Sequence, residues 1–253
     1  MITSISNETI KHIKSLYQKK YRDEFNEYIV EGIKLVKEAI NEKQEITKIV
    51  ICEELMTEEF DTEGYPVELV NKRVFDEISD TQTPQGVLAV IKIPSKQMIS
   101  SNIIFALDDV RDPGNIGTII RTLDCAGLND LILSTESVDI YNSKVVRSTM
   151  GAIFRVNVSY EDLENKLLDL QNKGYEIIIT DLDTEFSCYD TELNKKCVVV
   201  IGNEAHGVSD RIKDIADKKI RIPMYGRTES LNASVAAGIL IYESVRQNNL
   251  LSK

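Results

Sequence analysis

The chain has 253 residues, 42% hydrophobic and 28% charged, which is enough for one large globular domain or two small ones. The net charge of −11 excludes a uniformly basic nucleic-acid-binding protein, because such proteins neutralise phosphates with lysine and arginine. Four cysteines without a C-x-x-C pair argue against a disulfide framework or a zinc site. The N-terminus does not have the pattern of a signal peptide, and no apolar run is long enough for a membrane span. We therefore expect a cytoplasmic protein.

The first 93 residues predict a small α/β domain. Helices are expected over residues 7–19, over 27–41, where apolar residues recur at three- and four-residue spacing, and over 72–78. Strands are expected at 46–52, 66–70 and 86–93. The short polar segment 94–102 begins with a proline and is the best candidate for a linker.

From residue 103 onward, short strands alternate with helices. The expected strands cover residues 103–110, 130–134, 154–158, 176–182, 197–202 and 219–223. Their continuous β-branched runs are typical of strands covered on both faces, which predicts a parallel sheet. Ligands of such sheets bind outside the carboxyl ends of the strands, so the loops that follow the strands are the candidates for chemistry.

The first such loop lies in the segment 108–127. Pro113 and Gly114 predict a turn, Asn115 is expected to cap a helix, and Gly127 is expected to end it. The apolar stripe of this helix leaves Arg121 on the opposite side. Two interpretations of Arg121 remain open: an ordinary ion pair with Asp124, three residues later on the helix, or a functional role.

The second loop lies in the segment 198–210. Gly202 opens a glycine spacing typical of phosphate-binding loops, but Val208 stands where the phosphate-binding lysine is required. This excludes a nucleoside triphosphatase of that type. Glu204 in the same turn is either a plain exposed carboxylate or a functional one.

The third stretch, residues 224–246, passes from a polar run into a helix. Ser230 and Asn232 are expected to cap that helix, which continues to about residue 247. Its middle, residues 233–238, consists almost entirely of small residues. Small residues allow close packing against another backbone, and they also allow a chain to pass tightly beside another segment.

Three motifs in these loops, "NIGTIIRTLDCAG", "VVVIGNEAHGVS" and "IRIPMYGRTESLNASVAAGILIYE", resemble in order those of the SpoU (TrmH-type) RNA ribose methyltransferases of the SPOUT class. The N-terminal part is similar to the ribosomal-protein-like substrate-binding domain of many members. The resemblance implies an RNA-binding domain at 1–93, a linker at 94–102 and a methyltransferase domain at 103–253. It also implies a deep trefoil knot, through which the thin C-terminal helix passes.

The resemblance further implies S-adenosylmethionine as the cofactor, with no metal. The residues that it assigns to cofactor binding are Gly202, Asn203, Ile222, Met224, Leu231 and Asn232. The residues that it assigns to the active site are Asn115, Arg121, Glu204, Ser230 and Asn232. Ala205 is a departure, because glycine is common after the motif glutamate, and this puts the local turn geometry in doubt.

The activity that follows is transfer of a methyl group to a ribose 2'-hydroxyl, with ribosomal RNA as the expected substrate. A guanidinium is a poor proton acceptor, so we interpret Arg121 as a phosphate clamp and stabiliser of the developing alkoxide, and Glu204 as the more tunable group. A homodimer through the C-terminal domain is expected. The alternatives are a non-catalytic ribosome-assembly factor of the same fold, and a methyltransferase that acts on transfer RNA or on a base.

A basic run in the N-terminal part is the candidate for contact with RNA. No acidic residue occurs between Thr9 and Arg22. The run is either an electrostatic footprint for RNA or simply a solvated helix face. Its basic residues are Lys11, Lys14, Lys19, Lys20 and Arg22.

Overall fold

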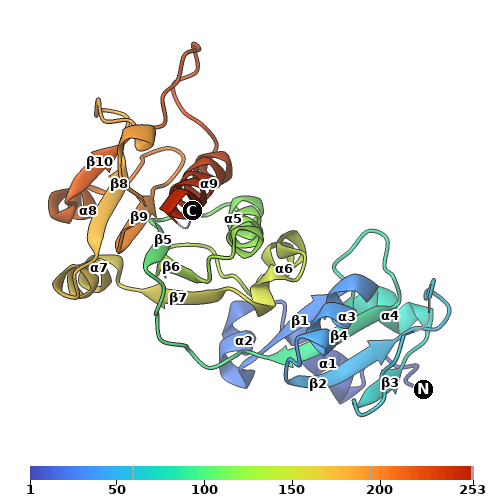
Figure 1. Cartoon of the computed structure of the whole chain (residues 1–253). Coiled ribbons are helices and arrows are strands. Elements are labelled where there is room, and N and C mark those ends of the chain that lie inside the picture. The colour runs from blue at the N-terminus through green and yellow to red at the C-terminus, as the bar shows by residue number, and fades with distance from the viewer. Residues whose placement is uncertain (59, 194, 252–253) are drawn as a thin grey trace. The chain divides into compact units, whose positions relative to one another are not determined.

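The computed structural model describes residues 1–58, 60–193 and 195–251, which form two compact units (Figure 1). The first unit comprises residues 1–95 together with 139–154, and the second comprises residues 96–138 and those from 155 onward. The expected α/β fold with a parallel sheet is confirmed. The domain boundaries at 93 and 103 stay predictions, and the first unit takes in one segment from the interior of the C-terminal half.

The first unit contains a four-stranded sheet in the order β1-β4-β2-β3, in which only β2 and β3 are parallel. Its strands are β1 (Glu27–Glu31), β2 (Ile46–Ile51), β3 (Val67–Leu69) and β4 (Val87–Lys92). Its helices are α1 (Glu8–Ser15), α2 (Lys19–Phe25), α3 (Ile33–Asn41), α4 (Lys72–Ile78), α6 (Ser143–Thr149) and the short 3-10 turn η1 (Ala152–Phe154).

Two of the predicted helices are wrong in their extent. The helix expected over 7–19 ends at Ser15, and a separate helix follows over Lys19–Phe25. The helix expected over 27–41 is a strand followed by a helix: residues 27–31 are all buried and pair with β4. Gly32, with φ of 104°, separates the two elements, and this backbone conformation is one that glycine adopts without strain.

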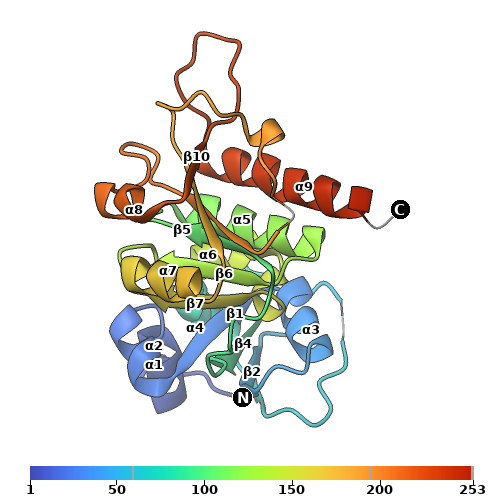
Figure 2. The same ribbon diagram turned by 60° about the vertical axis from the view of Figure 1, so that its left-hand side comes forward.

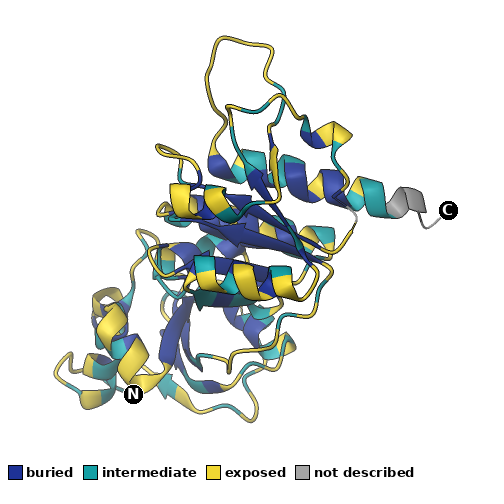
Figure 3. Ribbon diagram, turned by 90° about the vertical axis from the view of Figure 1, so that its left-hand side faces the viewer, coloured by how far each residue is buried: buried dark blue, intermediate teal, exposed yellow. Residues whose placement is uncertain are grey.

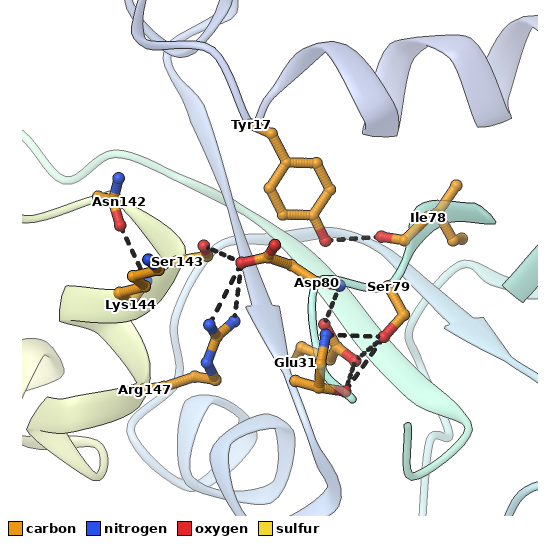
Figure 4. A network of polar contacts seen from close by, with 10 residues as sticks. Tyr17, Glu31, Ile78, Ser79, Asp80, Asn142, Ser143, Lys144 and Arg147 are labelled. Carbon is orange, nitrogen blue, oxygen red and sulfur yellow. Dashed lines mark hydrogen bonds and ion pairs between the residues drawn. The ribbon is translucent and has the colours of Figure 1, made fainter. Parts of the chain in front are cut away.

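Polar contacts tie the segment 139–154 into the first unit. The buried Arg22 guanidinium donates to Asp139 at 2.6 Å. Asp80 accepts from the Ser143 hydroxyl at 2.6 Å and from Arg147 at 3.2 Å (Figure 4). Because Val146 of α6 also lies in the apolar core of this unit, the segment belongs to it by packing as well as by charge.

The second unit is built on a six-stranded sheet in the order β10-β8-β9-β5-β6-β7, with every pair parallel. Its strands are β5 (Ile103–Leu107), β6 (Asp130–Ser134), β7 (Asn157–Glu161), β8 (Glu176–Thr180), β9 (Cys197–Ile201) and β10 (Lys218–Ile220). Its helices are α5 (Pro113–Ala126), α7 (Leu163–Asn172), α8 (Asp210–Ile215), α9 (Ala233–Leu251) and the 3-10 turn η2 (Cys188–Asp190).

Helices cover both faces of this sheet. Helices α7 and α8 pack on one face, while α5 and α9 lie together on the other (Figure 2). The central strands β5, β6 and β9 are buried at every residue, whereas the loop from β10 to α9 is mostly exposed (Figure 3). Both-sided burial explains the continuous apolar runs of the strand sequences.

Local details of the second unit correct two expectations. Helix α5 starts at Pro113 and is capped by Asp112, whose carboxylate accepts from the Asn115 N–H at 2.8 Å. The prediction that Asn115 caps this helix is therefore wrong, although Gly127 ends it as predicted, with φ of 71°. The strand expected at 154–158 begins only at Asn157.

None of the helices within the described ranges is both long and apolar enough to cross a membrane. The trefoil knot implied by the resemblance stays a prediction.

Candidate functional site

A cavity of about 360 Å³ opens at the carboxyl ends of β8, β9 and β10. This volume lies in the range of small-molecule sites, and its place at the strand ends is where open parallel sheets bind ligands. The loops after the three strands and the start of α9 form its walls. The lining residues from these loops include Thr180, Asp181, Leu182, Asp183, Gly202, Asn203, Glu204, His206, Ile222, Met224, Ser230 and Leu231.

The loop after β9 is closed by backbone contacts that leave no room for a side chain at Gly202. A Cβ at that position would lie 2.1 Å from the carbonyl carbon of Gly207. Asn203 and Gly207 exchange two backbone hydrogen bonds, at 3.0 and 2.8 Å, and Gly207 has φ of 67°. The Asn203 side chain also accepts from the N–H of Ala205 at 2.8 Å. The turn is therefore tightly defined with alanine at position 205.

Three polar side chains from distant parts of the chain meet beside this loop. The buried Asn115 amide on α5 donates to Glu204 Oε1 at 2.5 Å. The Asn115 carbonyl oxygen accepts from Asn232 Nδ2 at 3.0 Å. We call these three residues the Asn-Glu-Asn cluster. It joins the first, second and third motif segments through side-chain hydrogen bonds.

Asn232 is also the N-cap of α9. Its Oδ1 accepts from the Ser234 N–H at 2.9 Å, while its Nδ2 is used for Asn115. The two ends of one amide thus fix both the start of the helix and the orientation of the cluster.

Replacing Asn232 by alanine is expected to lower the melting temperature of the protein by a few degrees. The change removes a helix cap, worth about 1 kcal/mol, and leaves the buried Asn115 oxygen without its donor. Asn232→Asp is the matched control, because aspartate caps as well as asparagine but cannot donate to Asn115. Thermal unfolding should rank wild type above Asp and Asp above Ala, and equal melting of wild type and Ala would contradict the dual role.

The structure places the predicted residues in three different settings. Asn115 and Asn232 lie in the cluster and are not among the residues that line the cavity. Arg121 is exposed on α5 and, within the described residues, neither lines the cavity nor bonds to the cluster. The predicted residues that line the cavity are Gly202, Asn203, Glu204, Ile222, Met224, Ser230 and Leu231.

The alternative ion pair of Arg121 is not formed. Asp124 instead pairs with Arg155, at 2.9 Å. Arg121 therefore projects from the helix without the partner that the local spacing suggested.

The cavity wall at the end of β8 was missed by the sequence analysis. Residues 180–183 line the cavity, yet they match none of the three motifs. The available signal was their position at the carboxyl end of a predicted strand, which is the place where chemistry is expected in such sheets.

The basic run of the first unit is divided by its environment. Lys11, Lys19 and Lys20 are exposed, and none of them has an ion pair within the part of the chain that the structure describes. Lys14 pairs with Glu77, and Arg22 is only 4% exposed and bonded to Asp139. Arg22 thus serves the interior of this unit, and we leave it out of the candidate RNA surface.

No group of three or more His, Cys, Asp or Glu residues in the described ranges is arranged to hold a metal ion.

Comparison with known proteins matches two family models to the chain. Residues 102–242 match the SpoU rRNA Methylase family, and residues 7–89 match the MRM3-like substrate binding domain. The chain is 31% identical to the 23S rRNA (guanosine(2553)-2'-O)-methyltransferase RlmP of Bacillus subtilis (strain 168), over 95% of the chain and 97% of that protein. It is 28% identical to the 23S rRNA (guanosine-2'-O-)-methyltransferase RlmB of Escherichia coli (strain K12), over 75% of the chain and 82% of that protein.

Similarity extends to solved structures. The AdoMet-bound rRNA methyltransferase from Sinorhizobium meliloti matches with a TM-score of 0.83 and 33% identity, over 97% of each chain. The three motif segments that meet at the cavity and the cluster lie within the matched region. This chain belongs to the SpoU rRNA methylase family.

Proposed function

We propose that this protein transfers a methyl group from S-adenosylmethionine to a ribose 2'-hydroxyl of ribosomal RNA, in the large-subunit RNA on which the relatives named above act. The observation that carries the proposal is the Asn-Glu-Asn cluster beside a glycine-limited loop at the mouth of the cavity. We place the enzyme in the cytoplasm, because ribosomal RNA is its substrate.

The cavity fits the cofactor by its position and by its lining. Gly202 lines the cavity, and its missing Cβ lets the backbone of Gly207 and Val208 fold against it, so the turn presents backbone groups at this wall. Ile222, Met224 and Leu231 add apolar surface, and Asn203 belongs to the same turn. When bound there, S-adenosylmethionine supplies an electrophilic methyl group.

Glu204 is the group best placed to take the proton of the ribose hydroxyl. The Asn115 amide holds its Oε1, and no described residue donates to its Oε2. A carboxylate with one oxygen held and the other open can accept a hydrogen bond from the substrate hydroxyl and then its proton. Asn232 assists by fixing Asn115, and Ser230 at the cavity wall is available to the ribose or the cofactor.

The direct test is methyl transfer from labelled S-adenosylmethionine to deproteinised 23S rRNA, followed by mass analysis of the product nucleosides. A 2'-O-methylated nucleoside is the expected product. A methylated base would contradict ribose specificity, and transfer only to transfer RNA would contradict the substrate class. Binding of ribosomal RNA without any transfer would favour an assembly factor instead.

RNA binding through the first unit is the second part of the proposal. The match to a substrate-binding domain and the three exposed lysines support it. Replacing Lys11, Lys19 and Lys20 together by glutamine should weaken rRNA binding and flatten its dependence on salt, because fewer counterions are released. Filter binding over a salt series measures both quantities. An unchanged slope would mean that the lysines are an ordinary solvated surface.

A homodimer through the second unit is the third part. Val235 and Tyr242 lie two turns apart on α9 and are about half exposed, and Gly238 between them faces open space. Such a stripe is suited to an isologous contact. In a dimer, the exposed Arg121 of one subunit could act at the cavity of its partner, since it does not line the cavity of its own chain.

Light scattering at micromolar concentration should show a dimer that the change Tyr242→Glu dissociates, because a carboxylate buried in an apolar contact is costly. Asp210→Ala, at an exposed position of helix α8, is the control and should leave the mass unchanged. A wild-type monomer at this concentration would contradict the proposal.

A further inference from the structure

Three aromatic rings form a cluster on the surface of the first unit. The rings of Tyr21 and Phe25, one turn apart on α2, are nearly parallel, with centroids 6.3 Å apart and an interplanar angle of 12°. The His12 ring of α1 meets Phe25 edge-on, with centroids 4.6 Å apart. Phe25 is nevertheless 37% exposed. We call Tyr21, Phe25 and His12 the ring platform.

A buried carboxylate, that of Glu27, holds the His12 ring of the platform in place. Glu27 bonds to His12 Nε2 at 2.7 Å and to the Lys92 ammonium at 3.0 Å, and only 7% of it is exposed. Lys92 also donates to the backbone carbonyl of Phe25, at 3.2 Å. Contacts therefore hold both the ring and the backbone of Phe25 in place. A ligand that binds to this ring would lose little free energy to ordering the side chain.

Positive charge lies against the platform. The Lys20 ammonium lies over the Tyr21 ring, 5.5 Å from its centroid, which leaves Phe25 as the ring without a lysine over it, and Lys19 begins the same helix. Asp23 and Glu24 on α2 are also exposed, and neither has an ion pair with Lys19 or Lys20 in the described structure. The lysine side chains are thus available to an anionic ligand. The two carboxylates reduce the non-specific attraction of this helix for phosphates.

We infer that the ring platform stacks an unpaired base of the RNA substrate, with Lys20 and Lys19 on the neighbouring phosphates. Aromatic faces beside lysines match the two surfaces of a single-stranded nucleotide, a flat base and an anionic backbone. A duplex offers no free base face to such a platform. The inference rests on the proposed function, in which the first unit binds ribosomal RNA, and adds the part of the RNA that it recognises.

Filter binding of the full chain to deproteinised 23S rRNA tests this with two substitutions at one position. Phe25→Leu keeps apolar volume but removes the ring, and should weaken binding about tenfold, as expected for the loss of one stacked base. Phe25→Trp keeps a ring and should bind within about twofold of wild type. Val67→Ala, which removes an equally exposed apolar side chain on β3, is the matched control and should bind as wild type. Circular dichroism and melting temperature check that each variant is folded.

Methyl-transfer kinetics separate this inference from the proposed function. The expected effect of Phe25→Leu is a higher KM for RNA with unchanged kcat and unchanged affinity for S-adenosylmethionine. Wild-type binding by Phe25→Leu, an equal loss in Phe25→Trp, or a duplex that competes as well as a single strand would each overturn the platform. If the wild type binds rRNA through Phe25 but transfers no methyl group, the platform stands and the proposed activity falls. If the wild type does not bind the rRNA, both fall.

Discussion

Replacing Arg121 by alanine is expected to lower kcat for methyl transfer by about 10²- to 10³-fold, the usual cost of removing one donor to a developing oxyanion. The melting temperature and the affinity for S-adenosylmethionine should stay unchanged. The structure supports this separation, because the side chain is exposed, lies off the buried stripe of α5 and has lost its alternative partner Asp124 to Arg155. Single-turnover methyl transfer and calorimetric titration of the cofactor measure the two effects.

Arg121→Lys is the informative comparison, because it keeps the charge and loses the planar fork that binds phosphate through two donors. Recovery of most of the activity would mean that charge alone suffices. Loss of folding in Arg121→Ala would show instead that the residue is structural, and wild-type turnover would remove it from the active site.

Mixing two inactive variants can show in which subunit Arg121 acts. The heterodimer pairs an Arg121→Ala subunit, whose cavity is intact, with a subunit whose cavity is defective but which keeps Arg121. If Arg121 serves the partner's cavity, the mixture regains part of the activity that each variant lacks. If Arg121 serves the cavity of its own subunit, the mixture remains inactive. Catalysis would then not require Arg121 from a partner subunit.

The parts of the site that could be predicted are those fixed by short-range chemistry. Gly202 is required by a backbone approach within one six-residue turn, and Asn232 by the cap of the helix that it begins. Both requirements are visible in a local motif. The loop at residues 180–183 contributes to the cavity through its position at a strand end, and position in a sheet is not visible in a motif.

Long-range pairing explains the larger errors. The helical spacing of residues 27–41 is real, yet residues 27–31 form a strand because β4, some 60 positions away, supplies their hydrogen bonds. Tertiary pairing of this kind overrides local periodicity. Arg22 looked like part of a basic surface because its partner, Asp139, lies 117 positions later in the sequence.

Replacing Gly202 by alanine is expected to weaken the binding of S-adenosylmethionine at least a hundredfold, and methyl transfer with it. The new methyl group would lie 2.1 Å from the carbonyl carbon and 2.2 Å from the next backbone nitrogen across the turn, distances that no rotamer change can relieve. The Asn203–Gly207 pairing must therefore open, and overpacking of this kind costs about 1–3 kcal/mol or more. That opening displaces Glu204, which lies within the turn, from the Asn115 amide.

Gly226→Ala is the matched control, because Gly226 lies in the loop between β10 and α9 with nothing within 4 Å of the added carbon. It should bind the cofactor as wild type does. Gly207→Ala should be intermediate, since its Cβ meets open space but its φ of 67° is strained for alanine. Calorimetric titration of the three variants, with thermal melts to confirm folding, gives the ranking. If Gly202→Ala is folded and binds the cofactor as tightly as Gly226→Ala, the loop after β9 can change its conformation without a loss of affinity. The cofactor must then be held by the loops after β8 and β10 rather than by this turn.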